Sequence, residues 1–163
     1  MTKRILLVDD ELAIRESLSK TLRAENYEVV VAENSQEAIE KHERIDLLLL
    51  DLAMPLTDGW HAFRALVEIN PQLPVIVITG RSNQHARAES AGADALMEKP
   101  LDVPALLQTI RELLDEPMES RAQRASKRAS GFRDVPCKSD QFNAMLLERF
   151  TTPYPWPGSE DPR

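Results

Sequence analysis

The chain has 163 residues, of which 42% are hydrophobic, and a formal net charge of −7 at pH 7. That length accommodates one domain with an extension, and the hydrophobic content argues against a wholly disordered chain. No apolar run reaches the roughly 18 residues of a membrane-spanning helix, so we expect no membrane association. The first residues, MTKRILLVDD, contain too short an apolar run for a signal peptide. Cys137 is the only cysteine, which excludes an internal disulfide and favours a reducing, cytoplasmic environment.

Five apolar segments are typical of β-strands. They lie at about residues 4–8, 28–32, 46–51, 74–79 and 94–97. The third and fourth segments are continuous apolar runs, as expected for strands covered on both faces.

Helical patterns occupy the intervals between these strands. In the first interval, Ile14, Leu18 and Leu22 recur every four residues. Ser35 and Asp102 are suitable N-cap residues for the second and last helices. Five strands alternating with helices in about 115 residues predict an α/β fold: a doubly wound, five-stranded parallel sheet with helices on both faces.

The composition changes near Pro117. The segment Arg121–Arg133 contains five basic residues and no acidic one, whereas the preceding chain is acidic. We therefore divide the chain into an α/β domain, 1–117, and a mostly irregular extension, 118–163, that is basic and then rich in proline and aromatics. The extension is too short for a core of its own and is predicted to be an accessory interaction segment. One apolar patch in it has helical spacing and could dock on a partner: Phe142, Met145, Leu146 and Phe150.

Polar side chains follow four of the predicted strands. Asp9 and Asp10 come after the first, Asp51 ends the third, Thr79 ends the fourth and Lys99 follows the fifth. In an open parallel sheet, ligands bind in the crevice at the carboxyl ends of the strands. We therefore expect an acidic cluster, a hydroxyl and an amine to meet at one edge of the sheet.

The acidic cluster points to a divalent cation. Three aspartates at one edge would repel one another unless a cation lay among them. Mg²⁺ binds through one or two carboxylates, waters and phosphate oxygens, and Asp10 and Asp51 are natural ligands, with Asp9 nearby. The chain has no cluster of histidine and cysteine, which disfavours zinc. A metal beside Asp51 suggests that its carboxylate is a nucleophile toward a phosphoryl group, with Thr79 and Lys99 stabilising the transferred charge.

At these residues the chain resembles the receiver domain of two-component response regulators. The matching segments are ILLVDDE at 5–11, LLLLDLAMPLTDG at 47–59, PVIVITG at 74–80 and AGADALMEKPL at 91–101. The resemblance implies a flavodoxin-like fold with strand order 2-1-3-4-5.

The resemblance also implies a role for each site residue. Asp51 would accept phosphate from the phosphohistidine of a sensor histidine kinase or a phosphotransfer protein. Thr79 and Lys99 would contact the phosphoryl group, and a cis peptide would join Lys99 to Pro100. The protein would not be an enzyme beyond Mg²⁺-dependent self-phosphorylation and self-dephosphorylation at Asp51. Mg²⁺ would be held by the side chains of Asp9, Asp10 and Asp51 and by the backbone carbonyl of Ala53.

Two features bear on switching and on phosphoryl lifetime. The family often has an aromatic switch residue three positions before the lysine, where this chain has Leu96, so the aromatic partner of the usual threonine–aromatic rearrangement is missing at that position. Positions two past the acceptor and two past the threonine flank the path of attacking water in this family, and here they are Ala53 and Arg81.

We expect phosphorylation-dependent contacts with a downstream protein, and a phosphorylation-dependent dimer is a further form that such contacts could take. One alternative is a transcriptional or nucleic-acid-binding regulator that uses Arg121–Arg133, but no winged helix or helix-turn-helix pattern accompanies this basic run. A second alternative is an enzyme acting on small phosphorylated substrates, for which the sequence shows no separate base or substrate pocket.

Overall fold

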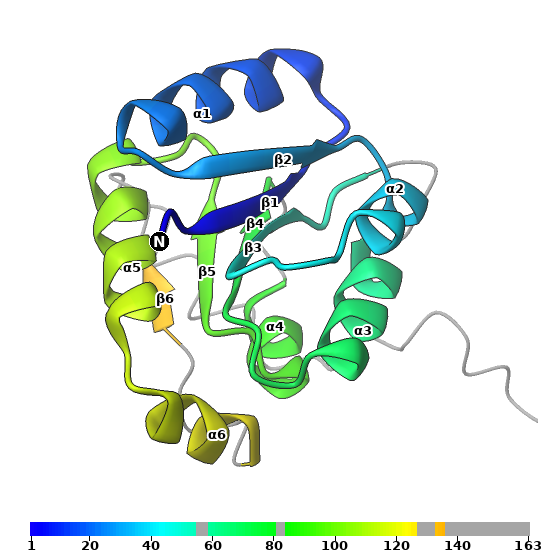
Figure 1. The fold of residues 1–163 in the computed structure, drawn as a ribbon. Helices are drawn as coiled ribbons and strands as arrows, with labels where there is room; N and C mark the ends of the chain where they lie inside the picture. The colour runs from blue at the N-terminus through cyan, green and yellow to red at the C-terminus, as the bar shows by residue number, and fades with distance from the viewer. Residues whose placement is uncertain (55–58, 81–83, 127–132, 136–163) are drawn as a thin grey trace, which may run out of the picture.

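The computed structural model describes residues 1–54, 59–80, 84–126 and 133–135 (Figure 1). Strands and helices alternate along the chain. The strands are β1 (Arg4–Val8), β2 (Glu28–Ala32), β3 (Leu47–Asp51), β4 (Val75–Thr79), β5 (Ala95–Glu98) and β6 (Arg133–Val135). The helices are α1 (Leu12–Ala24), α2 (Ser35–Glu40), α3 (Gly59–Ile69), α4 (His85–Ala91), α5 (Val103–Asp115) and α6 (Met118–Ser126).

The strands form one parallel sheet in the order β2-β1-β3-β4-β5-β6. Its first five strands confirm the predicted fold class, the strand order 2-1-3-4-5 and the predicted strand positions to within about a residue. The structure adds two elements that the sequence analysis did not anticipate, α6 and the short strand β6, which pairs with β5. The predicted apolar helix around Phe142–Phe150 lies outside the described residues.

Two apolar clusters, one on each face of the sheet, form the core. Side chains alternate between the faces of a strand, so Leu48 and Leu50 join the cluster beneath α3, whereas Leu47 and Leu49 join the cluster beneath α1 and α5. All five residues of β3 and of β4 are buried, as predicted for strands covered on both faces. Within the described residues, no helix combines the length and apolarity needed to cross a bilayer.

The helix caps agree with the sequence in one case and differ in the other. Asp102 caps α5, where its side chain accepts a hydrogen bond from the backbone N–H of Ala105 at 3.3 Å, as predicted. The prediction that Ser35 caps the second helix is wrong: the cap is Asn34, whose Oδ1 accepts from the backbone N–H of Glu37 at 2.9 Å. Asparagine and serine are nearly equivalent caps, so preference alone does not separate neighbouring candidates.

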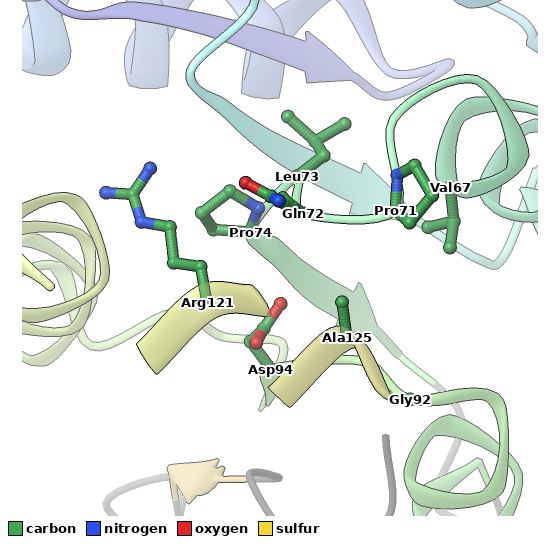
Figure 2. Close-up of a pocket in the computed structure, with 9 residues that line it drawn as sticks. All are labelled: Val67, Pro71, Gln72, Leu73, Pro74, Gly92, Asp94, Arg121 and Ala125. Carbon is green, nitrogen blue, oxygen red and sulfur yellow. The ribbon is translucent and has the colours of Figure 1, made fainter. Parts of the chain in front are cut away.

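Helix α6 packs at the end of the sheet where the strands begin. Arg121 Nη2 donates hydrogen bonds to the backbone carbonyls of Leu113, at 3.0 Å, and Leu114, at 2.7 Å, in the last turn of α5. Figure 2 shows Arg121 and Ala125 of α6 beside a small pocket whose other walls include Pro74 and Asp94. Pro74 precedes β4 and Asp94 precedes β5, so α6 lies at the end of the sheet opposite to the carboxyl ends of the strands.

Candidate functional site

The structure brings the predicted site residues together at the carboxyl ends of the strands. Asp9 directly follows β1, Asp51 and Thr79 are the last residues of β3 and β4, and Lys99 directly follows β5. One carboxylate oxygen from each of Asp9, Asp10 and Asp51 lies within 4.8 Å of the others. The prediction that these side chains share one edge therefore agrees with the structure.

The acidic cluster has the donors and the shape that a hard cation needs. Asp9 and Asp51 are 0% and 1% exposed, whereas Asp10 is exposed. An ion among them would contact carboxylate oxygens on its protein side and retain waters on its open side, which is the coordination that Mg²⁺ prefers. The donor set therefore fits Mg²⁺.

Backbone hydrogen bonds orient the two buried carboxylates. Asp9 Oδ1 accepts from the backbone N–H of Glu11, and Asp51 Oδ1 accepts from the backbone N–H of Ala53, both at 2.8 Å. Each carboxylate thus has one oxygen held by the turn that follows its strand. The second oxygen, Oδ2, faces Lys99 in both cases.

Lys99 binds three carboxylates at once. Its Nζ lies 3.1 Å from Asp9 Oδ2, 3.0 Å from Asp51 Oδ2 and 3.1 Å from Glu11 Oε1. Burial alone would lower the pKa of Lys99, but the hydrogen bonds and charges of Asp51 and Asp9 outweigh it, and the pKa is raised. Burial, with the nearby charge of Asp51, raises the pKa of Asp9, while the hydrogen bond from Glu11 and the contact with Lys99 act in the opposite direction. Lys99 is therefore a permanent positive charge at neutral pH.

Two residues at the site were not singled out in the sequence. Glu11, the third acid of the segment DDE, contacts Lys99, and its place beside Asp9 and Asp10 was a signal that could have been used. Arg15 of α1 donates from Nη1 to the backbone carbonyl of Asp9 at 2.6 Å, and its Nη2 lies 3.6 Å from Glu33 Oε2. A lone arginine in a helical pattern gives no sign of such a contact.

The remaining predicted residues have the following places. Thr79 is fully buried, and its backbone carbonyl accepts from the N–H of Lys99 at 2.9 Å. The Lys99–Pro100 peptide is cis, as the resemblance implied. Leu96 pairs with Val77 in the sheet and is 2% exposed. Arg81 lies outside the described residues.

Comparison with known proteins identifies the family to which this fold belongs. A family model described as the response regulator receiver domain matches residues 5–111. Response regulator MprA of Mycobacterium ulcerans is 37% identical over 139 residues, which cover 83% of this chain and 60% of the relative. MprA of Mycobacterium leprae is 41% identical over 115 residues, covering 68% of this chain and 50% of the relative. This chain thus spans between half and three-fifths of the length of these curated relatives.

Solved structures agree. A CheY-like receiver domain protein from Methanospirillum hungatei has a TM-score of 0.68 and 35% identity, covering 74% of this chain and 98% of that chain. TrrA from Thermotoga maritima, solved in complex with Mg²⁺ and BeF, has a TM-score of 0.62 and 34% identity, covering 69% and 99% of the two chains. A response regulator from Burkholderia pseudomallei, solved with a phosphorylated aspartic acid, a calcium ion and citrate, has a TM-score of 0.63 and 25% identity, covering 77% and 74%.

Phosphorylation of an aspartate is the mechanism of this family. The matched segment contains every residue of the acidic cluster together with Thr79 and Lys99. This chain belongs to the response regulator receiver domain family of two-component signalling proteins.

Proposed function

We propose that Asp51 accepts a phosphoryl group from the phosphohistidine of a sensor histidine kinase or a phosphotransfer protein. In this reaction a carboxylate oxygen of Asp51 bonds to phosphorus, the phosphorus–nitrogen bond breaks, and the imidazole leaves and takes up a proton. The observation that supports the proposal is that Asp51 is 1% exposed, ends its strand and lies in direct contact with Lys99. A carboxylate whose position and orientation are fixed by its neighbours is a well-placed nucleophile.

The surrounding residues supply charge stabilisation. We assign Asp9, Asp10, Asp51 and the backbone carbonyl of Ala53 as the residues that would hold Mg²⁺. When bound, the ion supplies positive charge beside the phosphoryl oxygens. The ammonium group of Lys99 and the hydroxyl of Thr79 would donate hydrogen bonds to the same oxygens. Self-dephosphorylation would proceed by attack of water on the aspartyl phosphate, which regenerates the Asp51 carboxylate and releases phosphate.

The chain is a receiver protein and not a conventional enzyme, so its output is a change in contacts. We propose a cytoplasmic response regulator that signals to a downstream protein, with 1–117 as the receiver and 118–163 as an accessory segment. The packing of α6 against α5 through Arg121 supports a close association of the first part of that segment with the receiver. Arg121 is also the first basic residue of the run considered for nucleic-acid binding, and its Nη2 is engaged by two carbonyls of α5, which directs this guanidinium toward the receiver.

Intact-mass measurement tests the phosphoacceptor assignment. The full chain is incubated with acetyl phosphate and Mg²⁺, and the mass increase of one phosphoryl group is followed. We expect Asp51→Asn to lose the adduct, because an amide is a poor nucleophile. Asp115→Asn is the matched control, since Asp115 is an exposed aspartate at the end of α5 and should not affect labelling. Equal labelling of Asp51→Asn and the wild type would refute the assignment.

A further inference from the structure

A buried hydrogen bond joins the start of α3 to the start of α4. Trp60 is the second residue of α3 and is 2% exposed. Its indole Nε1 donates to Gln84 Oε1 at 3.3 Å. Gln84 is the residue that immediately precedes α4, and it is 7% exposed. Because the donor and the acceptor are both removed from water, separating them leaves two buried polar groups to be satisfied elsewhere.

The indole ring is held by both helices. Arg87 of α4 places its guanidinium carbon 4.5 Å from the centre of the Trp60 ring, in a cation–π contact. Phe63 of α3 meets the same ring edge-on, with 5.5 Å between ring centroids and an interplanar angle of 69°. These contacts are directional, so a displacement of α4 relative to α3 must stretch or break those that Gln84 and Arg87 make.

The Trp60 side of this contact continues into the proposed phosphoryl site. Gly59, which precedes Trp60, packs so closely on the acceptor strand that a Cβ atom there would lie 2.7 Å from the backbone oxygen of Asp51. A shift of the Asp51 backbone therefore reaches Trp60 through one residue, Gly59, and reaches Gln84 through the hydrogen bond of Trp60.

The residue at the family's usual switch position cannot supply this coupling. Leu96 is buried in the same apolar cluster as Trp60, Phe63 and Ala88 of α4. A leucine has no aromatic ring that could switch between rotamers. It also has no polar group that could form a hydrogen bond with the hydroxyl of Thr79. If Thr79 responds to phosphorylation, other side chains must transmit that response to α4.

We propose that the contact among Trp60, Gln84 and Arg87 couples phosphorylation of Asp51 to the position of α4. The inference rests on the proposed function, in which Asp51 is the phosphoacceptor. A phosphoryl group that is bound better in one of two arrangements shifts the population toward that arrangement. Linkage makes this coupling reciprocal. If binding of a phosphoryl mimic shifts the equilibrium between the formed and the broken contact, a variant that breaks the contact must change the dissociation constant of the mimic. The coupling is therefore measurable from either end.

Two variants remove the hydrogen bond from opposite sides. Trp60→Phe loses the indole N–H and keeps an aromatic ring for Arg87 and Phe63. Gln84→Ala loses the acceptor and leaves Trp60 unchanged. Gln108→Ala is the matched control, because it removes an exposed glutamine that pairs with Glu112 on α5, away from α4.

The experiment uses the full chain, with beryllofluoride and Mg²⁺ as the phosphoryl mimic. Hydrogen exchange of α4 is measured by mass spectrometry with and without the mimic, and the dissociation constant of the mimic is determined for each variant. We expect the mimic to alter α4 exchange in the wild type and in Gln108→Ala but not in Trp60→Phe or Gln84→Ala. The dissociation constants of these two variants should differ from that of the wild type by about fivefold or more. Their double variant should be no more affected than either single variant, because they break one contact.

Three results would overturn the inference, and they are distinguishable. If both variants keep the wild-type response of α4 and the wild-type affinity, the contact does not carry the coupling. If acetyl phosphate labels Asp51 but α4 exchange in the wild type ignores the mimic, α4 is not the responding element. If the wild type neither binds the mimic nor accepts phosphate, the phosphoacceptor assignment fails and the inference fails with it. Should one variant not fold, the other alone decides between these results.

Discussion

Replacement of Arg121 by alanine should destabilise the protein without affecting phosphorylation. The side chain joins α6 to the end of α5 through two hydrogen bonds, at 3.0 Å to Leu113 O and 2.7 Å to Leu114 O. Basic side chains near a helix C-terminus satisfy its last carbonyls and interact favourably with the helix dipole. Hydrogen bonds to a charged group contribute about 1.5–3 kcal/mol each. Because one nitrogen of a half-buried side chain makes both bonds and water can replace it, we expect a loss of about 2 kcal/mol in all.

The loss is measurable by thermal and urea unfolding of the full chain. For a chain of this size about 2 kcal/mol corresponds to a decrease in Tm of roughly 4–8 °C. Arg111→Ala is the control: Arg111 Nη2 lies 3.0 Å from Glu25 Oε2 with both side chains exposed, and such a pair contributes about 0–1 kcal/mol. Arg121→Ala should still accept phosphate from acetyl phosphate, because α6 is at the opposite end of the sheet. If it unfolds like the wild type, the packing of α6 on α5 does not contribute to stability.

Three further predictions concern the acidic site. Saturating Mg²⁺ should raise the Tm, because Mg²⁺ at about 100 times its dissociation constant adds ~2.7 kcal/mol to the free energy of unfolding. The increase should be smaller in Asp10→Asn, and no Mg²⁺ dependence in the wild type would count against the metal site. Titration of a Trp156→Phe variant should show Mg²⁺ binding as a change in Trp60 fluorescence, and Arg15→Ala should weaken that binding by roughly tenfold, because partners that orient metal ligands have effects of this size. Gly59→Ala should destabilise the fold by about 1–3 kcal/mol in urea unfolding, because the new Cβ would lie 2.7 Å from the backbone oxygen of Asp51; an unchanged midpoint would show that α3 can shift to accept it.

The position of the site could be predicted from the sequence because it follows from topology. Asp9, Asp51, Thr79 and Lys99 each stand at the end of an apolar run, and parallel strands place all such ends at one edge. The details at that edge could not be predicted in the same way. Glu11 contacts Lys99 across 88 positions of sequence, and this contact depends on side-chain rotamers at the start of α1, which no periodicity encodes.

The extension shows a different limit of the sequence. The α6 segment, MESRAQRAS, consists largely of good helix formers, so propensity permits a helix there. The extension was predicted to be mostly irregular, whereas the structure has a helix here whose Arg121 bonds to backbone carbonyls in the last turn of α5, seven and eight residues earlier in the sequence. Strand β6 has three residues, too few for an alternating pattern to indicate a strand.

Structural contacts with α6 lie at one end of the sheet and the acidic site lies at the other end. Strand β5 runs between these two ends. Where β5 begins, Asp94 Oδ2 accepts from the backbone N–H of Val75 at 2.8 Å and lies at the pocket bordered by α6 (Figure 2). Where β5 ends, Lys99 contacts Asp9 and Asp51. Strand β6 pairs with β5 between these two points and covers an edge whose backbone groups could otherwise pair with another chain. The extension therefore contacts the receiver along β5, the strand that Lys99 directly follows. We expect a change in the pairing of β6 to act on the element that positions Lys99, whereas a change in α6 acts at the opposite end of the sheet.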